Sequence, residues 1–253
     1  MLEVNEVSKS FGGLMAVFEC SLRVEEGTIT GLIGPNGAGK TTLFNVITGN
    51  YKPDQGRITF LGEDIAGLPP HQIFKKKMYR TFQITREFGR MTVLENLMYM
   101  PEGQIGEKLW NTWLRHGAVR HQEKEIREKA LEVLEFVELI NLKDEYAGSL
   151  SGGQKKLLEL ARSMMADPKM VLLDEPAAGV NRTLLGKLAD NIRKLCVEKK
   201  ITFFLVEHNM DLVMNLCNPV IVMSEGRKLA EGTPEEIKKN KSVLEAYLGG
   251  QYR

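Results

Sequence analysis

Residues 34–42 read GPNGAGKTT, and the apolar stretch TITGLI stands directly before them. From Gly34 to Thr41 the residues match the pattern G-x-x-x-x-G-K-[ST], between a predicted strand and a predicted helix. The glycines let backbone N–H groups converge on phosphate oxygens, Lys40 adds positive charge, and the Thr41 hydroxyl can bind magnesium. We therefore predict a nucleoside triphosphate site, rather than a glycine turn that only joins two elements. The pattern alone does not choose among kinases, GTPases and motor ATPases.

Two adjacent acids follow the apolar run 171–173, in the stretch KMVLLDEP. A deeply buried strand rarely ends in two carboxylates without a use for them, although a solvated strand end is the simpler alternative. We predict that Asp174 holds the magnesium ion. Glu175 points differently because it lies one residue further on, so it can polarise a water for attack on the γ-phosphate.

A second glycine-rich helix start occurs in LSGGQ, residues 150–154. Its N–H groups and the helix dipole suit anionic oxygen as well as the first loop does. The alternative is that Ser151 is an N-cap, which is worth about 1 kcal/mol, and both interpretations can hold together. One nucleotide rarely needs two such loops, so the second loop requires an explanation of its own.

Length and charge limit the classes of protein. The 253 residues can bury one sizeable core, and 34 basic against 33 acidic residues leave a formal charge of +1, a balance that calls for neither nucleic acid nor an anionic membrane as a partner. No apolar run approaches the ~20 residues that cross a bilayer. The start, MLEVNEVSKSFGG, lacks the features of a secretory signal, and the three cysteines suit buried thiols in a reducing compartment. We expect a cytoplasmic protein.

Periodicity predicts an α/β fold with a mostly parallel sheet. Strands are expected in residues 2–11, 21–34 and 56–65, a helix over 40–49, and a hairpin over 219–232. Residues 92–167 form a largely helical lobe, in which 123–140 is an amphipathic helix and 101–121 is irregular. A strand ending at Asp174, a helix from about Thr183 and the strand ITFFLVEH come next. Thr233 to Glu236 is a capping box that starts a last helix to about Leu248.

The motifs together resemble the nucleotide-binding subunits of ABC (ATP-binding cassette) transporters. They are, in the family's order, Walker A at residues 34–42, Gln83 in TFQIT, the signature LSGGQ, Walker B at 170–174 followed by Glu175, and His208 in VEHNM. The resemblance implies a P-loop NTPase (RecA-like) core with a mostly parallel sheet, an antiparallel β subdomain and an inserted α-helical subdomain. Residues 1–253 would be one ABC ATPase domain, with 1–86 and 168–253 in the core and β subdomain and about 87–167 in the helical signature subdomain.

The resemblance also assigns ATP and Mg²⁺ as cofactors and gives roles to individual residues. Catalysis falls to Glu175, His208, Gln83 and Lys40, and the metal to Thr41, Gln83 and Asp174. Nucleotide binding falls to Phe11, Gly34, Asn36, Gly37, Ala38, Gly39, Lys40, Thr41, Thr42, Ser151, Gly153 and Gln154. Taken alone, Phe11 would be a core residue and His208 a structural histidine.

Partners follow from the same resemblance. The signature loop would close on ATP held by a second copy or a paralogous subunit, in an ATP-dependent head-to-tail dimer that contains two ATP sites. The dimer would dock on transmembrane permease subunits, and indirectly on a substrate-binding protein, at the inner face of the cell membrane. Asn181 stands where many members have aspartate, so hydrogen bonding by Asn181 across that interface is an expectation.

Four stretches look like the ATP-binding subunits of branched-chain amino-acid importers: SKSFGGLMAV, TFQITREFGRMTVLENL, DEPAAGVN and AEGTPEEIKKNKSVLEAYLG. ATP hydrolysis would then power solute import across the cytoplasmic membrane. Alternatives are an ATPase of the lipopolysaccharide-export or urea and amide-import type, or a soluble ABC ATPase acting in DNA repair or on ribosomes. A scaffold that binds ATP without hydrolysis would lack the carboxylate of Glu175.

The segment 101–121 contains both tryptophans, Trp110 and Trp113, beside two arginines and two histidines. Their i, i+3 spacing suits a helix with one buried face, so we expect them in the core of the lobe. A contact surface for the membrane subunit is the alternative. The lysine run 75–77 is expected on a solvated face, with a phospholipid-facing role as the alternative.

Overall fold

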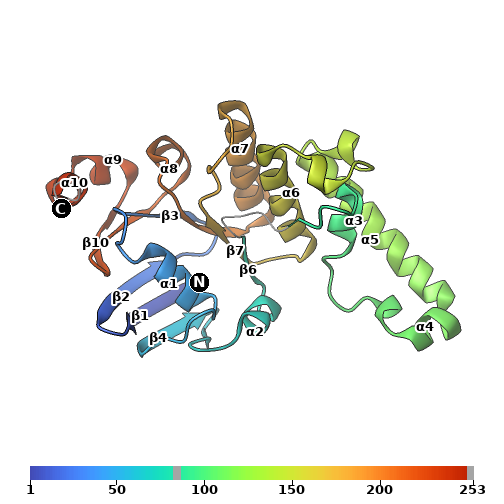
Figure 1. Ribbon diagram of the computed structural model, residues 1–253, viewed down its shortest axis with the longest axis horizontal. Helices are drawn as coiled ribbons and strands as arrows, with labels where there is room; N and C mark the ends of the chain where they lie inside the picture. The colour runs from blue at the N-terminus through green and yellow to red at the C-terminus, as the bar shows by residue number, and fades with distance from the viewer. Residues whose placement is uncertain (82–86, 250–253) are drawn as a thin grey trace. The chain divides into compact units, whose positions relative to one another are not determined.

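The computed structural model describes residues 1–81 and 87–249. The chain divides into two compact units. The first contains Met1–Gln83, Lys169–Ala178 and Ile192–Arg253, and the second contains Ile84–Pro168 and Gly179–Asn191. Each unit has its own secondary structure, and the ribbon in Figure 1 follows the chain through both.

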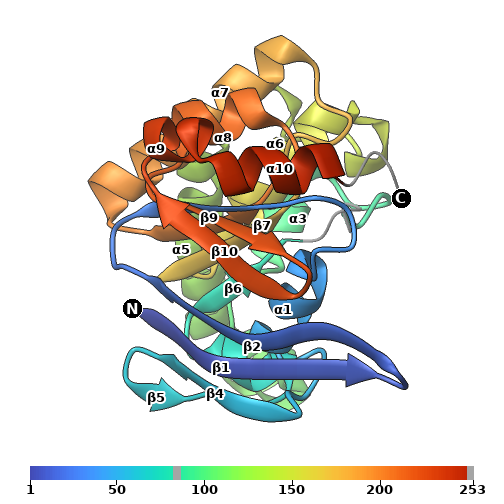
Figure 2. The ribbon, with the colours of Figure 1, turned by 90° about the vertical axis from the view of Figure 1, so that its left-hand side faces the viewer.

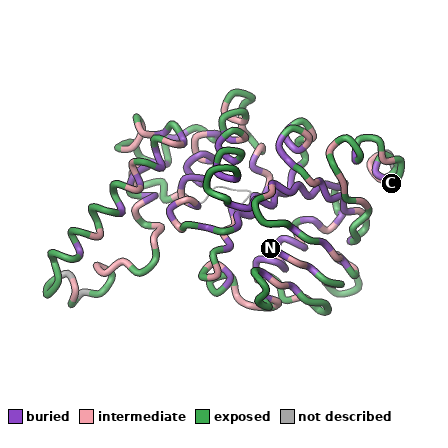
Figure 3. Tube along the Cα trace, turned by 180° about the vertical axis from the view of Figure 1, so that it is seen from behind, coloured by how far each residue is buried: buried purple, intermediate pink, exposed green. Residues whose placement is uncertain are grey.

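A six-stranded sheet forms the centre of the first unit, with strand order β10-β9-β3-β8-β7-β6. Its strands are β3 (Ile29–Ile33), β6 (Met78–Arg80), β7 (Met170–Asp174), β8 (Thr202–Val206), β9 (Val220–Ser224) and β10 (Arg227–Gly232). Five strands are parallel, and β10 pairs antiparallel with β9 as the predicted hairpin. Every residue of β3, β7 and β8 is buried, which explains their continuous apolar sequences (Figure 3). The predicted mostly parallel sheet is confirmed.

A second sheet of the same unit is antiparallel, with order β2-β1-β4-β5. Its strands are β1 (Leu2–Phe11), β2 (Leu14–Val24), β4 (Gln55–Phe60) and β5 (Glu63–Asp64), and Figure 2 shows β1 and β2 side by side. The stretch 21–34, predicted as one strand, is divided between the sheets. β2 ends at Val24, and a turn through Gly27, whose φ is +68°, leads into β3. Glycine adopts that left-handed conformation without strain, so the chain changes sheets there.

Helix α1 (Lys40–Ile47) packs against both sheets. Its side chains Leu43, Phe44, Val46 and Ile47 are fully buried in one apolar cluster with residues of β1, β4, β7 and β8. The Phe44 ring lies 4.9 Å from the Phe204 ring on β8. Because α1 begins at Lys40, this packing fixes the position of the glycine loop that precedes it.

The remaining helices of the first unit include α2 (Pro70–Lys75), α8 (Met210–Leu216), α9 (Pro234–Lys239) and α10 (Lys241–Gly249). The capping box between Thr233 and Glu236 is confirmed. The single last helix predicted after it is wrong, because Asn240 takes an extended conformation and ends α9. The Asn240 side-chain oxygen then accepts a hydrogen bond from the Val243 N–H at 3.3 Å and starts α10.

The second unit is helical. It contains α3 (Val93–Met98), α4 (Leu109–Leu114), α5 (His116–Phe136), α6 (Gly152–Met165) and the beginning of α7 (Arg182–Lys199), with short turns η1 (Ile105–Glu107), η2 (Ile140–Leu142) and η3 (Ala147–Ser149). Asn96 is fully buried and donates to the Phe88 and Thr92 carbonyls, which holds the start of α3 in place.

Residues 101–121 differ from their prediction in two respects. They are not irregular throughout, because they contain η1, α4 and the first residues of α5. Trp110 and Trp113 are not in the core: they are 76% and 84% exposed. Helical spacing placed the two rings on one face correctly, but that face is turned to solvent.

All three cysteines, Cys20, Cys196 and Cys217, are free and buried, as predicted. Among the described residues, no helix has both the length and the apolar character of a membrane span.

Burial should protect two of these thiols from alkylation. It raises the pKa of Cys20 to about 11 and that of Cys217 to about 12, from an ordinary 9.0. At pH 8 the thiolate fraction of Cys20 is then about 100-fold below that of an exposed thiol. We expect iodoacetamide to leave both unmodified in the native protein and to modify all three cysteines in urea, as counted by mass spectrometry. Native modification of Cys217 at the rate seen in urea would contradict this burial.

Candidate nucleotide site

The glycine loop joins β3 to α1, and two of its glycines are required by the backbone. Gly34 and Gly39 have φ values of +151° and +92°. A Cβ atom at Gly34 would lie 2.1 Å from the Met223 carbonyl oxygen, and one at Gly39 would lie 2.2 Å from the Ala16 carbonyl oxygen. Conformation and space both exclude a side chain at these positions.

The Lys40 side chain lies inside the loop and is only 5% exposed. Its ammonium donates to the Gly34 carbonyl at 2.8 Å and to the Pro35 carbonyl at 2.9 Å. Burial lowers the pKa of Lys40, and the nearby charge of Glu175 acts in the opposite direction. An ammonium has three N–H donors, so a phosphate oxygen can accept from it as well.

Asp174 and Glu175 follow β7 as predicted and have different surroundings. Asp174 is buried at the end of the strand, whereas Glu175 has a left-handed φ of +49°, and its N–H donates to the Val206 carbonyl of β8. The Glu175 carboxylate oxygen Oε1 lies 3.2 Å from Nε2 of His208. Two residues 33 positions apart in the sequence are thereby brought together at the carboxyl ends of neighbouring parallel strands.

Asp174 forms a buried ion pair with Arg80, at the end of β6, with 2.8 Å between Oδ2 and Nη2. Arg80 also donates to Asn45 at 2.7 Å and to Thr48 at 2.9 Å, both at the C-terminal part of α1. Arg80 was not among the predicted site residues. The sequence offers no signal for it, because the pairing of β6 with β7 is not visible in either stretch.

The oxygen donors present suit magnesium. Among the described residues, no group of three or more His, Cys, Asp or Glu side chains could hold a metal ion. Thr41 and Asp174 instead offer one hydroxyl and one carboxylate, and Mg²⁺ is commonly held by one or two such groups together with phosphate oxygens and water.

Glu207 holds the loops after β7 and β8 together. Glu207 is 3% exposed, and its carboxylate accepts hydrogen bonds from the N–H groups of Ala177 at 2.6 Å, His208 at 2.9 Å and Asn209 at 3.0 Å. His208 was predicted as a site residue, but its neighbour Glu207 was not. An acid at the end of a fully buried strand was the available signal, as it was for Asp174.

Phe11 ends β1 and is not a core residue, since 42% of it is exposed. It packs edge-on against Tyr51, with 5.1 Å between ring centroids. The Lys9 ammonium lies 5.6 Å from the centroid of the Phe11 ring, and the part of the ring that is exposed can stack on a base. Gln83, predicted to touch the metal or the attacking water, lies outside the described residues.

The signature residues belong to the second unit. Ser151 is the N-cap of α6 and forms a capping box with Gln154: the Ser151 N–H donates to Oε1 of Gln154 at 2.8 Å, and the Gln154 N–H donates to the serine hydroxyl at 3.4 Å. The N-cap interpretation is confirmed. A Cβ at Gly153 would lie 2.5 Å from a methyl carbon of Leu184, so this glycine allows α6 to approach α7. Asn181 caps α7 by accepting from the Leu184 N–H at 2.9 Å.

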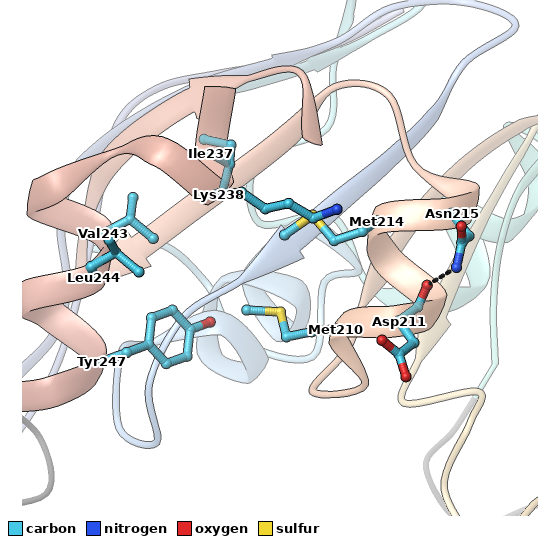
Figure 4. Close-up of a pocket in the computed structure, with 9 residues that line it drawn as sticks. All are labelled: Met210, Asp211, Met214, Asn215, Ile237, Lys238, Val243, Leu244 and Tyr247. Atoms are coloured by element: carbon cyan, nitrogen blue, oxygen red, sulfur yellow. Dashed lines mark hydrogen bonds between the residues drawn. The ribbon is translucent and has the colours of Figure 1, made fainter. Parts of the chain in front are cut away.

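Helix α10 reaches the glycine loop through Tyr247. Burial raises the pKa of the Tyr247 phenol, and a hydrogen bond with the backbone of Gly34 partly offsets that effect. Tyr247 also lines a cavity of about 320 Å³ between α8 and the last two helices, shown in Figure 4. Met210, two residues after His208, lies on the opposite wall. The sequence analysis assigned no part of the site to the C-terminal helix.

A glycine loop after a central parallel strand, a lysine inside the loop and acids at the end of a second strand define a nucleoside-triphosphate-binding domain of the P-loop class. The family model described as "ABC transporter" matches residues 17–178, and a second, "Branched-chain amino acid ATP-binding cassette transporter", matches 227–253. The chain belongs to the ABC transporter family, whose ATP-binding domains are ATPases that drive transport.

Two relatives are similar over almost the whole chain. The "Probable branched-chain amino acid transport ATP-binding protein LivG" of Archaeoglobus fulgidus is 44% identical and covers 99% of this chain and 96% of its own. The "High-affinity branched-chain amino acid transport ATP-binding protein BraF" of Pseudomonas aeruginosa is also 44% identical, with 98% of each chain covered.

Solved structures agree with the fold. A nucleotide-free ATP-binding cassette from an ABC transporter has a TM-score of 0.83 and 40% identity, and covers 97% of this chain and 98% of its own. The ADP conformation of an ATP-binding cassette of an ABC transporter has a TM-score of 0.83 and 37% identity, with 98% of each chain covered. The predicted P-loop NTPase core is confirmed.

Replacing Glu207 by Gln should disturb the site without changing its size. One carboxamide oxygen cannot accept all three N–H groups, and its NH₂ would face donors, so we expect a loss of about 1–3 kcal/mol in the free energy of unfolding. Displacement of His208 should lower the ATPase rate as well. Urea denaturation and phosphate release measure the two effects. Glu26→Gln, at an exposed position, is the matched control, and equal stabilities of the two variants would contradict the role of Glu207.

Proposed function

We propose that this chain is the ATP-hydrolysing subunit of an importer of branched-chain amino acids. The observation that carries the ATPase assignment is the Glu175 carboxylate beside His208, on the same edge of the sheet as the lysine-filled glycine loop. The names of the relatives that match over almost the whole chain, and the family match at residues 227–253, support branched-chain amino acids as the transported solute.

ATP binds with its triphosphate on the N–H groups of residues 34–42, at the N-terminal end of α1. Lys40 contacts the outer phosphates, and the exposed ring of Phe11 stacks on the adenine. Thr41 and Asp174 would hold Mg²⁺ with the phosphate oxygens, and Gln83, which lies outside the described residues, would be a further ligand. The bound metal would neutralise charge that develops on the phosphates.

Hydrolysis needs a base and a group that stabilises negative charge. Glu175 accepts a proton from water, whose oxygen attacks the γ-phosphorus while the bond to the bridging oxygen of ADP breaks. His208 lies 3.2 Å from the Glu175 carboxylate, so it can orient that carboxylate and contact the γ-phosphate. Glu207 fixes the backbone of His208.

A second copy of the chain completes each site. The N-terminal end of α6 has its first residues, Ser151 and Gly152, exposed to solvent. Their position suits the γ-phosphate of an ATP bound to the other copy. The resulting head-to-tail dimer docks on permease subunits at the inner face of the membrane, and ATP-driven closure and reopening drives import.

Replacing Glu175 by Gln should stop hydrolysis and leave binding intact, because the amide has the same shape but cannot take a proton. We expect the ATPase rate to fall by at least 100-fold, within the range for loss of a general base. Mg-ATP should then hold the variant as a dimer on size-exclusion chromatography. Leucine uptake by cells that depend on the complete transporter should be lost.

Two variants separate the parts of this proposal. Glu198→Gln, at an exposed position of α7, should keep full activity. Lys40→Ala should weaken nucleotide binding itself and give no ATP-dependent dimer. Hydrolysis at the wild-type rate by the Glu175 variant would exclude Glu175 as the base. Unchanged leucine uptake alongside lost ATPase activity would exclude leucine as the solute and leave the ATPase assignment intact.

A further inference from the structure

Helix α4 presents an apolar face that its own unit does not cover. Trp110, Trp113 and Leu114 are 76%, 84% and 77% exposed, and their i, i+3, i+4 spacing places them on one side of the helix. These two are the chain's only tryptophans. Figure 1 shows α4 beside the N-terminal end of α5.

The polar part of α4 is the part that is anchored. The Asn111 side chain donates to the Ile105 carbonyl of η1 at 2.9 Å, and the Ile105 N–H donates to the Gln122 side chain of α5 at 2.7 Å. A Cβ at Gly106 would lie 3.3 Å from Val119, so η1 packs closely on α5. The segment is therefore held in place with its hydrophobic side outward, the reverse of a helix that covers a core.

Basic side chains flank this face. Between residues 108 and 122, Lys108, Arg115 and Arg120 are the only side chains with a fixed charge, and all three are exposed. His116 and His121 are exposed as well. The nearest acids, Glu107 and Glu123, lie just outside the stretch. His121 lies 3.4 Å from Glu125 on α5, so Lys108, Arg115 and Arg120 are the groups beside this face that can attract an anionic surface.

We propose that α4 is a contact site for the anionic phospholipid surface of a membrane. Tryptophan prefers the interface between headgroups and acyl chains, and flanking arginines bind the lipid phosphates. Both indoles are exposed on one side of α4 beside Arg115, the arrangement of aromatic and basic side chains that suits an anionic lipid interface. This site goes beyond the proposed function, because ATP binding and hydrolysis do not require it.

The two tryptophans make the test direct, because all indole fluorescence of the chain comes from α4. We expect vesicles of phosphatidylcholine mixed with phosphatidylglycerol to shift the emission to shorter wavelength, to protect it from acrylamide quenching, and to co-sediment the protein. Vesicles of phosphatidylcholine alone should do so far more weakly, and added salt should reduce the effect.

Variants then assign the contact. Trp110→Ser with Trp113→Ser should abolish co-sedimentation. Replacing both Arg115 and Arg120 by Gln should lower the affinity for these vesicles about 25-fold, because each basic residue near an anionic surface contributes roughly fivefold. Matched controls are Tyr146→Ser, which removes another exposed aromatic side chain, and Arg127→Gln, twelve residues beyond Arg115 on α5. All four proteins should keep the lipid-free ATPase rate.

Several results would overturn the proposal. One is unchanged emission and no co-sedimentation with phosphatidylglycerol vesicles. Another is co-sedimentation that the double tryptophan variant retains. A third is protection of the indoles only by detergent-solubilised permease, or only by raising the protein concentration, since α4 would then contact a protein or a second copy. None of these results would alter the ATPase assignment.

Discussion

Charge buried at the carboxyl edge of the six-stranded sheet constrains the first unit. Lys40 is held by two loop carbonyls, Asp174 by Arg80, and Glu207 by three backbone N–H groups. An unpaired buried charge costs several kcal/mol, so each partner must stay where it is. These pairings fix the positions of the glycine loop, the end of β7 and the loop after β8 that contains His208. The same positions suit the binding of a triphosphate. The same contacts that keep the fold intact therefore prepare the site.

Features that depend on neighbouring residues could be predicted from the sequence. Three such features are the glycine loop, the hairpin of β9 and β10, and the capping box at Thr233. Each depends on one short continuous stretch of sequence. Contacts between distant residues could not. Arg80 and Asp174 are 94 positions apart, and Glu207 and Ala177 are 30 apart, so only the order of strands brings them together. Periodicity has a further limit: at Trp110 and Trp113 it identified a common face but not what lies against it.

The two units divide the chemistry of an ATP-binding cassette. The first contains the glycine loop and the residues that we propose as the base and as metal ligands. The second contains the signature helix start, where Ser151 caps α6 through its hydroxyl and is itself exposed. A second nucleotide loop in one chain has a physical reason if the two loops act on different ATP molecules. The exposed tryptophans of α4 add a surface that neither loop uses and extend the proposed contacts from the permease to the lipid around it.

The most direct measurement mixes two inactive variants. Lys40→Ala removes the lysine from one triphosphate loop, and Ser151→Arg blocks one signature loop but leaves its own ATP binding intact. Each variant alone should lack ATPase activity, and the mixture should regain activity, because each mixed dimer contains one intact composite site and so one of the two sites of the wild type. A mixture that forms dimers with ATP but stays inactive would contradict the claim that the signature of one copy completes the site of the other.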